Sequence, residues 1–153
     1  MGKGFRFVNL KAESGFTLLE VTIVLIIMCV ILSFAMPRFQ LTFENTRVDL
    51  AATGLKTIWT AERLYNTQNK TWAPDLATLS QAQLIDPYFT TQNNDPKAPF
   101  LFSIALTDSG YSASATRQNS NLWNGSISIN EQGQLSGDIT SSSGNAIIQP
   151  SNY

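Results

Sequence analysis

The chain has 153 residues, of which 43% are hydrophobic and 14% charged, and its formal net charge at pH 7 is -1. This length suits a single domain, and the near-zero net charge gives no general footprint for nucleic acid. The sequence contains one cysteine and no histidine. These counts exclude histidine-based catalytic triads, zinc clusters and an internal disulfide, and they disfavour an enzyme because histidine carries much of the acid–base chemistry near neutral pH.

An apolar run occupies residues 16–36, and Glu20 is its only charged side chain. A helix of about 20 apolar residues spans a bilayer, so this run predicts a membrane-spanning helix. Lys3, Arg6 and Lys11 precede it. Because the basic flank of a span stays in the cytoplasm, the C-terminal part of the chain is predicted to lie outside it.

Two ordinary interpretations of this N-terminus compete with a functional one. A secretory signal could be cleaved after Ala35, within Ser33-Phe34-Ala35, which would release a soluble periplasmic binding module. However, the apolar run is longer than the apolar region of a secretory signal, which usually has roughly 7–15 residues. A plain membrane anchor would have no use for Glu20, since a charge at the bilayer centre costs about 2.5–3.5 kcal/mol on insertion scales.

Ser14-Gly15-Phe16-Thr17-Leu18-Leu19-Glu20 resembles the processing site of type IV pilins and of the related pseudopilins of type II secretion. The resemblance implies cleavage between Gly15 and Phe16 by a prepilin peptidase, followed by N-methylation of Phe16. Glu20 would then be the fifth residue of the mature chain, as the family glutamate is. Pro37 matches a helix-kinking proline that many members have.

The same resemblance implies a domain organisation and a cellular location. Residues 1–15 would be the leader peptide, residues 16–36 the transmembrane and filament-core helix, and residues 37–153 a pilin-like head. The protein is expected in the bacterial inner membrane, with its N-terminus cytoplasmic and its head outside, and afterwards in a pilus or a periplasmic pseudopilus.

The function that the resemblance implies is that of a structural subunit of a filament. Its expected partners are further subunits of a homo- or hetero-oligomeric filament, the prepilin peptidase, an inner-membrane assembly platform and membrane lipid before assembly. Neither a cofactor nor nucleic acid is expected. Glu20 would pair with the ammonium group of Phe16 on a neighbour and select the packing register, because a lone buried charge costs several kcal/mol.

A type IV pilus subunit and a pseudopilin of a type II secretion or competence system share all of these features. Many adhesive type IV pilins carry a C-terminal disulfide loop, for which this chain lacks the cysteines. Glu20 argues against the tip-initiating pseudopilin, which typically lacks this glutamate. The sequence therefore leaves the choice between pilus and pseudopilus open.

One long helix is predicted from about residue 16 to about residue 67, with a possible bend at Pro37. Its second half is amphipathic, with apolar residues spaced mainly by three and four: Val48, Ala51, Ala52, Leu55, Ile58, Trp59 and Tyr65. The charged residues are expected largely on other faces: Glu44, Arg47, Lys56, Glu62 and Arg63. Gly54 lowers helix stability by about 1 kcal/mol relative to alanine, without an evident purpose.

The predicted fold class is α+β: a pilin-like long helix packed on a small antiparallel sheet. A connecting region over residues 66–99 contains Asp75 as a predicted helix N-cap, followed by Leu76, Leu79 and Leu84. The sheet is predicted within residues 100–148, as two hairpins with strands at 100–106, 111–116, 126–129 and 134–136 and with turns at Gly110 and Gly133. The tail from Thr140 is compatible with either an edge strand or irregular structure.

Three acidic residues near the predicted turns are candidate calcium ligands: Asp108, Glu131 and Asp138. They lack a regular ligand spacing, and surface carboxylates near turns are mostly solvated. No metal site is therefore predicted.

Overall fold

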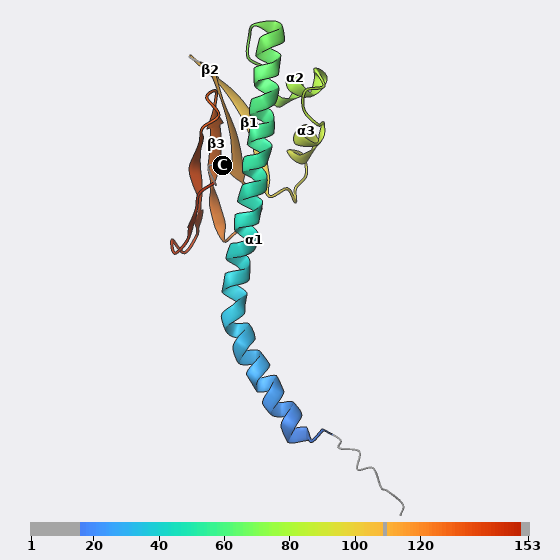
Figure 1. Cartoon of the computed structure of the whole chain (residues 1–153), viewed down its shortest axis with the longest axis vertical. Coiled ribbons are helices and arrows are strands. Elements are labelled where there is room, and N and C mark those ends of the chain that lie inside the picture. Colours follow the sequence, from blue (N-terminus) through green and yellow to red (C-terminus); the bar gives the residue numbers. More distant parts are fainter. Residues whose placement is uncertain (1–15, 109, 151–153) are drawn as a thin grey trace, which may run out of the picture. The chain divides into compact units, whose positions relative to one another are not determined.

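The computed structural model describes residues 16–108 and 110–150, so Gly15 and the rest of the predicted leader lie outside it. Within these residues three helices precede five strands (Figure 1). The elements are α1 (Leu18–Asn69), α2 (Leu76–Gln81), α3 (Tyr88–Gln92), β1 (Phe100–Thr107), β2 (Gly110–Arg117), β3 (Trp123–Asn130), β4 (Leu135–Ser141) and β5 (Ile147–Ile148). The long helix and the antiparallel sheet confirm the predicted α+β, pilin-like fold.

Two compact units make up the chain, with the boundary between Gln40 and Leu41. The described residues of the first unit form the apolar N-terminal part of α1. The second unit holds the rest of α1 and all the later elements, and it is called the head below. The backbone of α1 is helical through Pro37, and a bend at this residue stays a prediction.

The sheet is a meander in which each strand pairs antiparallel with its neighbour in sequence, in the order β1-β2-β3-β4-β5 among the described residues. Gly133 in the β3–β4 turn has φ +82°, as the predicted turn requires. The β1–β2 turn contains residue 109, which lies outside the described residues. The tail does add an edge strand, because Ile147 and Ile148 pair with Thr140 and Ile139.

The core of the head lies between the sheet and the C-terminal half of α1 (Figure 1). Apolar residues spaced by three and four turn one face of the helix inward, while alternation turns every second strand residue toward it. The buried set on α1 is Val48, Ala51, Ala52, Leu55, Ile58 and Ala61, and it meets Ala113, Ala115, Ile127, Ile129 and Ile139 of the sheet. Trp59 and Tyr65 pack at the margin of this core. The predicted apolar face is confirmed.

Two of the charged residues expected on other faces of α1 are buried, and that expectation was wrong for them. Glu44 and Glu62 have exposed fractions of 1% and 0%. They lie 18 residues apart, which is about five turns of an α-helix, so they share the face of the apolar stripe. Each carboxyl is tolerated inside because it accepts a hydrogen bond there, from Arg117 at Glu44 and from the backbone N–H of Ala73 at Glu62.

The connecting region forms two short helices, α2 and α3. The apolar residues of this region predicted the first of them. Asp75 is the N-cap of α2, with its Oδ1 accepting a hydrogen bond from the N–H of Thr78 at 2.8 Å. Leu76 and Leu79 are buried and Leu84 packs against the core. The predicted N-cap and apolar face are confirmed.

One edge of the sheet, along β1, is covered at Phe102 by the side chain of Asn93. The Nδ2 group of Asn93 donates to the carbonyl of Phe102 at 2.6 Å, and the N–H of Phe102 donates to Asn93 Oδ1 at 2.9 Å. This amide therefore occupies the place that a peptide group of a further strand would take. It satisfies backbone groups that an open edge leaves unpaired.

The packing of two aromatic rings explains why residue 54 is a glycine. A Cβ atom at this position would lie 3.1 Å from the ring of Phe102 and 3.2 Å from the ring of Phe89. Glycine therefore lets the two aromatic side chains pack edge to face against the helix backbone, with ring centroids 5.4 Å apart. This close approach compensates for the helix propensity that glycine lacks.

Substitutions at Gly54 test this packing. We expect Gly54→Ala to change stability little, because about 1 kcal/mol of helix propensity is offset by displaced rings, and Gly54→Leu to lose about 1–3 kcal/mol through overpacking. Urea unfolding of the full chain in detergent, followed by tryptophan fluorescence, reports on the head, which contains Trp59, Trp72 and Trp123. Thr60→Leu on the exposed face of α1 is the control, and a Gly54→Leu variant as stable as the wild type would contradict the close-packing argument.

Candidate functional site

The N-terminal end of α1 is capped by Thr17. The Thr17 side-chain oxygen accepts a hydrogen bond from the N–H of Glu20 at 3.2 Å, and the Thr17 carbonyl accepts from the N–H of Val21 at 3.2 Å. Glu20 is therefore the third residue of the first turn, and the pattern Thr-x-x-Glu is that of a capping box. The sequence analysis missed this role, although the spacing alone signals it.

The cap leaves the Glu20 carboxyl for another task. The Thr17 oxygen accepts from the backbone N–H of Glu20, and Glu20 is exposed in the isolated chain. A negative charge in the first turn of a helix is stabilised by the helix dipole. Glu20 thus has a local reason to tolerate its charge, and its carboxyl stays available to a group outside this chain.

The residues that follow present an apolar surface with no cover of their own. Phe16 and Leu18 are 80% and 83% exposed, and the large apolar side chains from Leu19 to Phe34 are exposed too. By length and composition this part of α1 can cross a membrane, and none of its most apolar window is buried. An apolar surface of this extent needs lipid or another protein around it.

Residues 10–36 match a family model described as the prokaryotic N-terminal methylation motif. The chain carries a prepilin-type motif. The match includes Gly15, Phe16 and Glu20, and Pro37 follows directly after it. The motif is one of structural, pilin-type proteins and not of an enzyme family. No curated protein and no solved structure gives a significant match to the chain.

Together, the motif and the apolar helix fit a pilin-like or pseudopilin protein anchored in the inner membrane. A prepilin motif implies processing by a prepilin peptidase and assembly into a filament. Gly15 lies outside the described residues, and Phe16 directly precedes the capped end of α1. The cleavage site, the methylation of Phe16 and the assembly role of Glu20 stay predictions.

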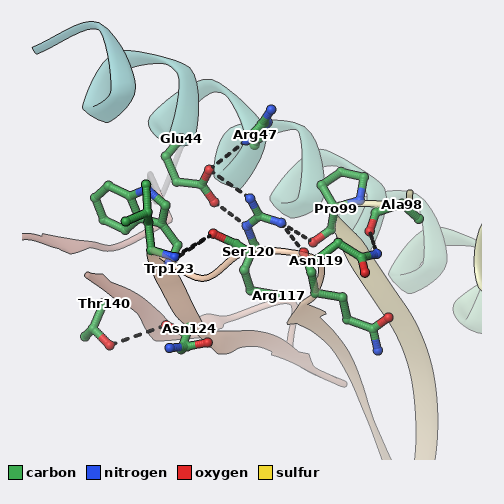
Figure 2. Close-up of polar contacts among 12 residues, drawn as sticks. Glu44, Arg47, Ala98, Pro99, Arg117, Asn119, Ser120, Trp123, Asn124 and Thr140 are labelled. Carbon is green, nitrogen blue, oxygen red and sulfur yellow. Dashed lines mark hydrogen bonds and ion pairs between the residues drawn. The ribbon is translucent and has the colours of Figure 1, made fainter. Parts of the chain in front are cut away.

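The head begins with a buried ion pair that the sequence analysis missed (Figure 2). Arg117 Nε donates to Glu44 Oε1, and Arg117 Nη2 donates to Glu44 Oε2 at 3.1 Å. The two side chains are 3% and 1% exposed. Such a paired, two-pronged geometry is the arrangement in which a guanidinium satisfies a carboxylate most completely.

Further contacts hold the guanidinium in place. Arg117 Nη1 donates to the carbonyls of Pro99, at 2.9 Å, and of Gln118. The ring of Phe100 lies under the guanidinium, with 5.6 Å from Cζ to the ring centroid. The pair thereby joins α1 to both ends of the β1–β2 hairpin.

The loop after β2 is shaped around the same point (Figure 2). Asn119 adopts φ +57°, which asparagine tolerates better than most residues. Its Nδ2 group donates to the carbonyl of Ala98 at 2.9 Å, and Ser120 Oγ accepts from the N–H of Trp123 at 3.0 Å. The donors and acceptors around Arg117 are thus used in holding the fold together, and this cluster is structural.

Two signals in the sequence could have revealed the pair. Glu44 lies four residues before Val48 on the apolar stripe, and Arg117 continues the inward alternation of Tyr111, Ala113 and Ala115. The three acidic residues weighed as calcium ligands do not form a cluster: within residues 16–108 and 110–150, no three acidic, histidine or cysteine side chains gather.

We expect Arg117→Met to destabilise the head by about 3–5 kcal/mol, because it leaves Glu44 buried without its counter-ion. Arg47→Met is the matched control: Arg47 also contacts Glu44, at 3.1 Å, but its side chain is 51% exposed, and exposed pairs contribute about 0–1 kcal/mol. Urea unfolding of the full chain at pH 7 measures both.

Combining Arg117→Met with Glu44→Gln should recover part of the loss, since the second change removes the stranded charge. Equal losses of unfolding free energy in Arg47→Met and Arg117→Met would show that the buried ion pair contributes no more to stability than the exposed one.

Proposed function

We propose that this protein is a structural subunit of a type IV pilus or a pilus-like filament, processed at Gly15-Phe16 and polymerised through its N-terminal helix. The observation that carries the proposal is the combination of the methylation motif with a capped helix start whose apolar side chains are all uncovered. The motif supports the processing, and the uncovered helix supports the need for partners.

Processing changes what the helix can do. Before cleavage the basic leader, with Lys3, Arg6 and Lys11, holds the N-terminus on the cytoplasmic side of the membrane. Cleavage before Phe16 removes these charges and leaves an apolar helix end with a single new ammonium group. Such a helix can exchange its lipid contacts for contacts with the same helix of other subunits.

Glu20 supplies register in this exchange. In an apolar filament core the lowest-cost partner for its carboxylate is the Phe16 ammonium of a neighbouring subunit. The pair adds little net stability, but a misregistered neighbour would leave both charges unpaired. The capping contact keeps the backbone around Glu20 helical while the side chain makes this contact.

A pseudopilin of a type II secretion or competence system is the second candidate. A head without cysteine counts against the adhesive type IV pilins that carry a C-terminal disulfide loop and is compatible with this candidate, since Cys29 lies in the apolar helix. A periplasmic binding module released after Ala35 is less well supported, because that cut would fall within the continuous helix α1.

Mass spectrometry of the membrane-bound protein tests the processing. We expect an N-terminus at Phe16 carrying one methyl group. Gly15→Leu should block this cleavage, because a peptidase must approach the backbone closely at the glycine, whereas Ala35→Leu should leave it unchanged. An N-terminus at Met36, abolished by Ala35→Leu, would replace the filament subunit with a secreted soluble protein.

Glu20→Gln tests the register role separately from the cap, because the Thr17 side chain still accepts from the backbone N–H of residue 20. We expect normal insertion and cleavage, and a sharp loss of subunits from sheared filaments, since a broken buried pair costs about 3–5 kcal/mol. Thr17→Val is the complementary control: it removes the side-chain cap but keeps the carboxyl, and filament yield should fall much less. Normal filament yield from Glu20→Gln would end the register argument.

A further inference from the structure

A second buried carboxyl, Glu62, lies near the C-terminal end of α1, and among the described residues no cation pairs with it as Arg117 pairs with Glu44. Glu62 is 0% exposed. Its Oε2 accepts a hydrogen bond from the N–H of Ala73 at 3.0 Å, which ties the last turns of α1 to the segment after the helix. Within the described ranges, Glu62 Oε1 has no hydrogen-bond partner.

Tyr111 on β2 presents a second orphaned polar atom in the same region. Tyr111 is 2% exposed, and its hydroxyl also lacks a partner among the residues that the structure describes. Its ring packs on Trp72, with centroids 4.9 Å apart. Burial raises the pKa of the Tyr111 hydroxyl, and the charge of Glu62 raises it further, so the two side chains act on each other.

Charges of both signs surround this site. Arg63 on α1 stacks over the ring of Trp59, 4.8 Å from its centroid, and its positive charge lowers the pKa of the Tyr111 hydroxyl. Glu131, in the β3–β4 turn, acts on Tyr111 with the same sign as Glu62. Burial accordingly raises the pKa of the Glu62 carboxyl above its ordinary value, and the Ala73 hydrogen bond only partly opposes this.

We propose that Glu62 is a proton-binding site that controls how firmly the end of α1 is held to the segment that follows the helix. In the neutral form Oε1 carries a proton, and Oε2 still accepts from the N–H of Ala73. In the ionised form the site holds an uncompensated buried charge, which is costly.

The consequence for stability has a definite sign. Because the pKa of Glu62 is higher in the folded than in the unfolded head, its favourable contribution is complete below the unfolded value, near 4.5. It is lost as the pH rises through the folded value. The head should therefore loosen at the end of α1 as the medium becomes more alkaline. The expectation that this end of α1 faces the medium outside the cytoplasm rests on the proposed function, whereas the titration of Glu62 does not.

Two variants of the full chain in detergent test the site. Glu62→Gln keeps the acceptor for Ala73 and cannot ionise, so its unfolding temperature should exceed that of the wild type by a margin that grows from pH 4 to pH 8. Asp75→Asn is the control: hydrogen bonds from Thr78 lower the pKa of Asp75, so any effect should shrink as the pH falls.

Infrared spectroscopy gives a readout that is independent of the unfolding measurements. The C=O stretch of a protonated carboxyl should persist above pH 4.5, where exposed carboxyls have ionised, and should be missing in Glu62→Gln. A stability difference that is constant with pH, or a protonated-carboxyl band that disappears together with the exposed groups, would overturn the proposal. Neither result would bear on cleavage at Gly15-Phe16 or on filament assembly.

Discussion

The face of α1 that meets the sheet imposes the main constraint on the head, because it begins and ends in a buried carboxyl group. Glu44 and Glu62 bracket the stripe from Val48 to Ile58, about 27 Å apart along the helix. Each carboxyl fixes a different partner: Arg117 brings in the β1–β2 hairpin, and the N–H of Ala73 brings in the chain after the helix. Burial of the alanine-rich stripe between them then supplies most of the apolar contact.

Sequence patterns predicted the elements well and the buried charges poorly. Spacings of three and four located the amphipathic half of α1, and the cap at Asp75 and the turn at Gly133 followed from the special backbone chemistry of those residue types. The apolar count treats a carboxyl as exposed wherever it occurs, so by itself it did not place Glu44 inside, although Glu44 lies on the stripe: burial of this charge depends on a partner 73 residues away. The purpose of Gly54 was hidden for the same reason, since Phe89 and Phe102 come from other elements.

At the N-terminal segment the informative features are local in the sequence and need no distant partner. Gly15, Phe16 and Glu20 were recognisable as a short linear motif because a peptidase reads the chain locally, and the same local character places the capping threonine at Thr17. The structure adds that the backbone N–H of Glu20 is capped by Thr17, while its side chain is exposed in the isolated chain. The two halves of α1 thus place their carboxyls differently: Glu44 and Glu62 are buried in the head, whereas Glu20 is exposed in the isolated chain.

The amide of Asn93 on the edge of β1 has a consequence for crowding. A filament would hold many copies of this head at very high local concentration, where uncharged strands such as β1, which reads FLFSIALT, tend to recruit one another into cross-β stacks. An incoming strand would have to displace the Asn93 amide before it could form its own hydrogen bonds to the backbone of Phe102. The cost of that displacement falls on the first step of strand addition, when few other contacts hold the incoming strand, so the Asn93 amide opposes aggregation through this edge of the sheet.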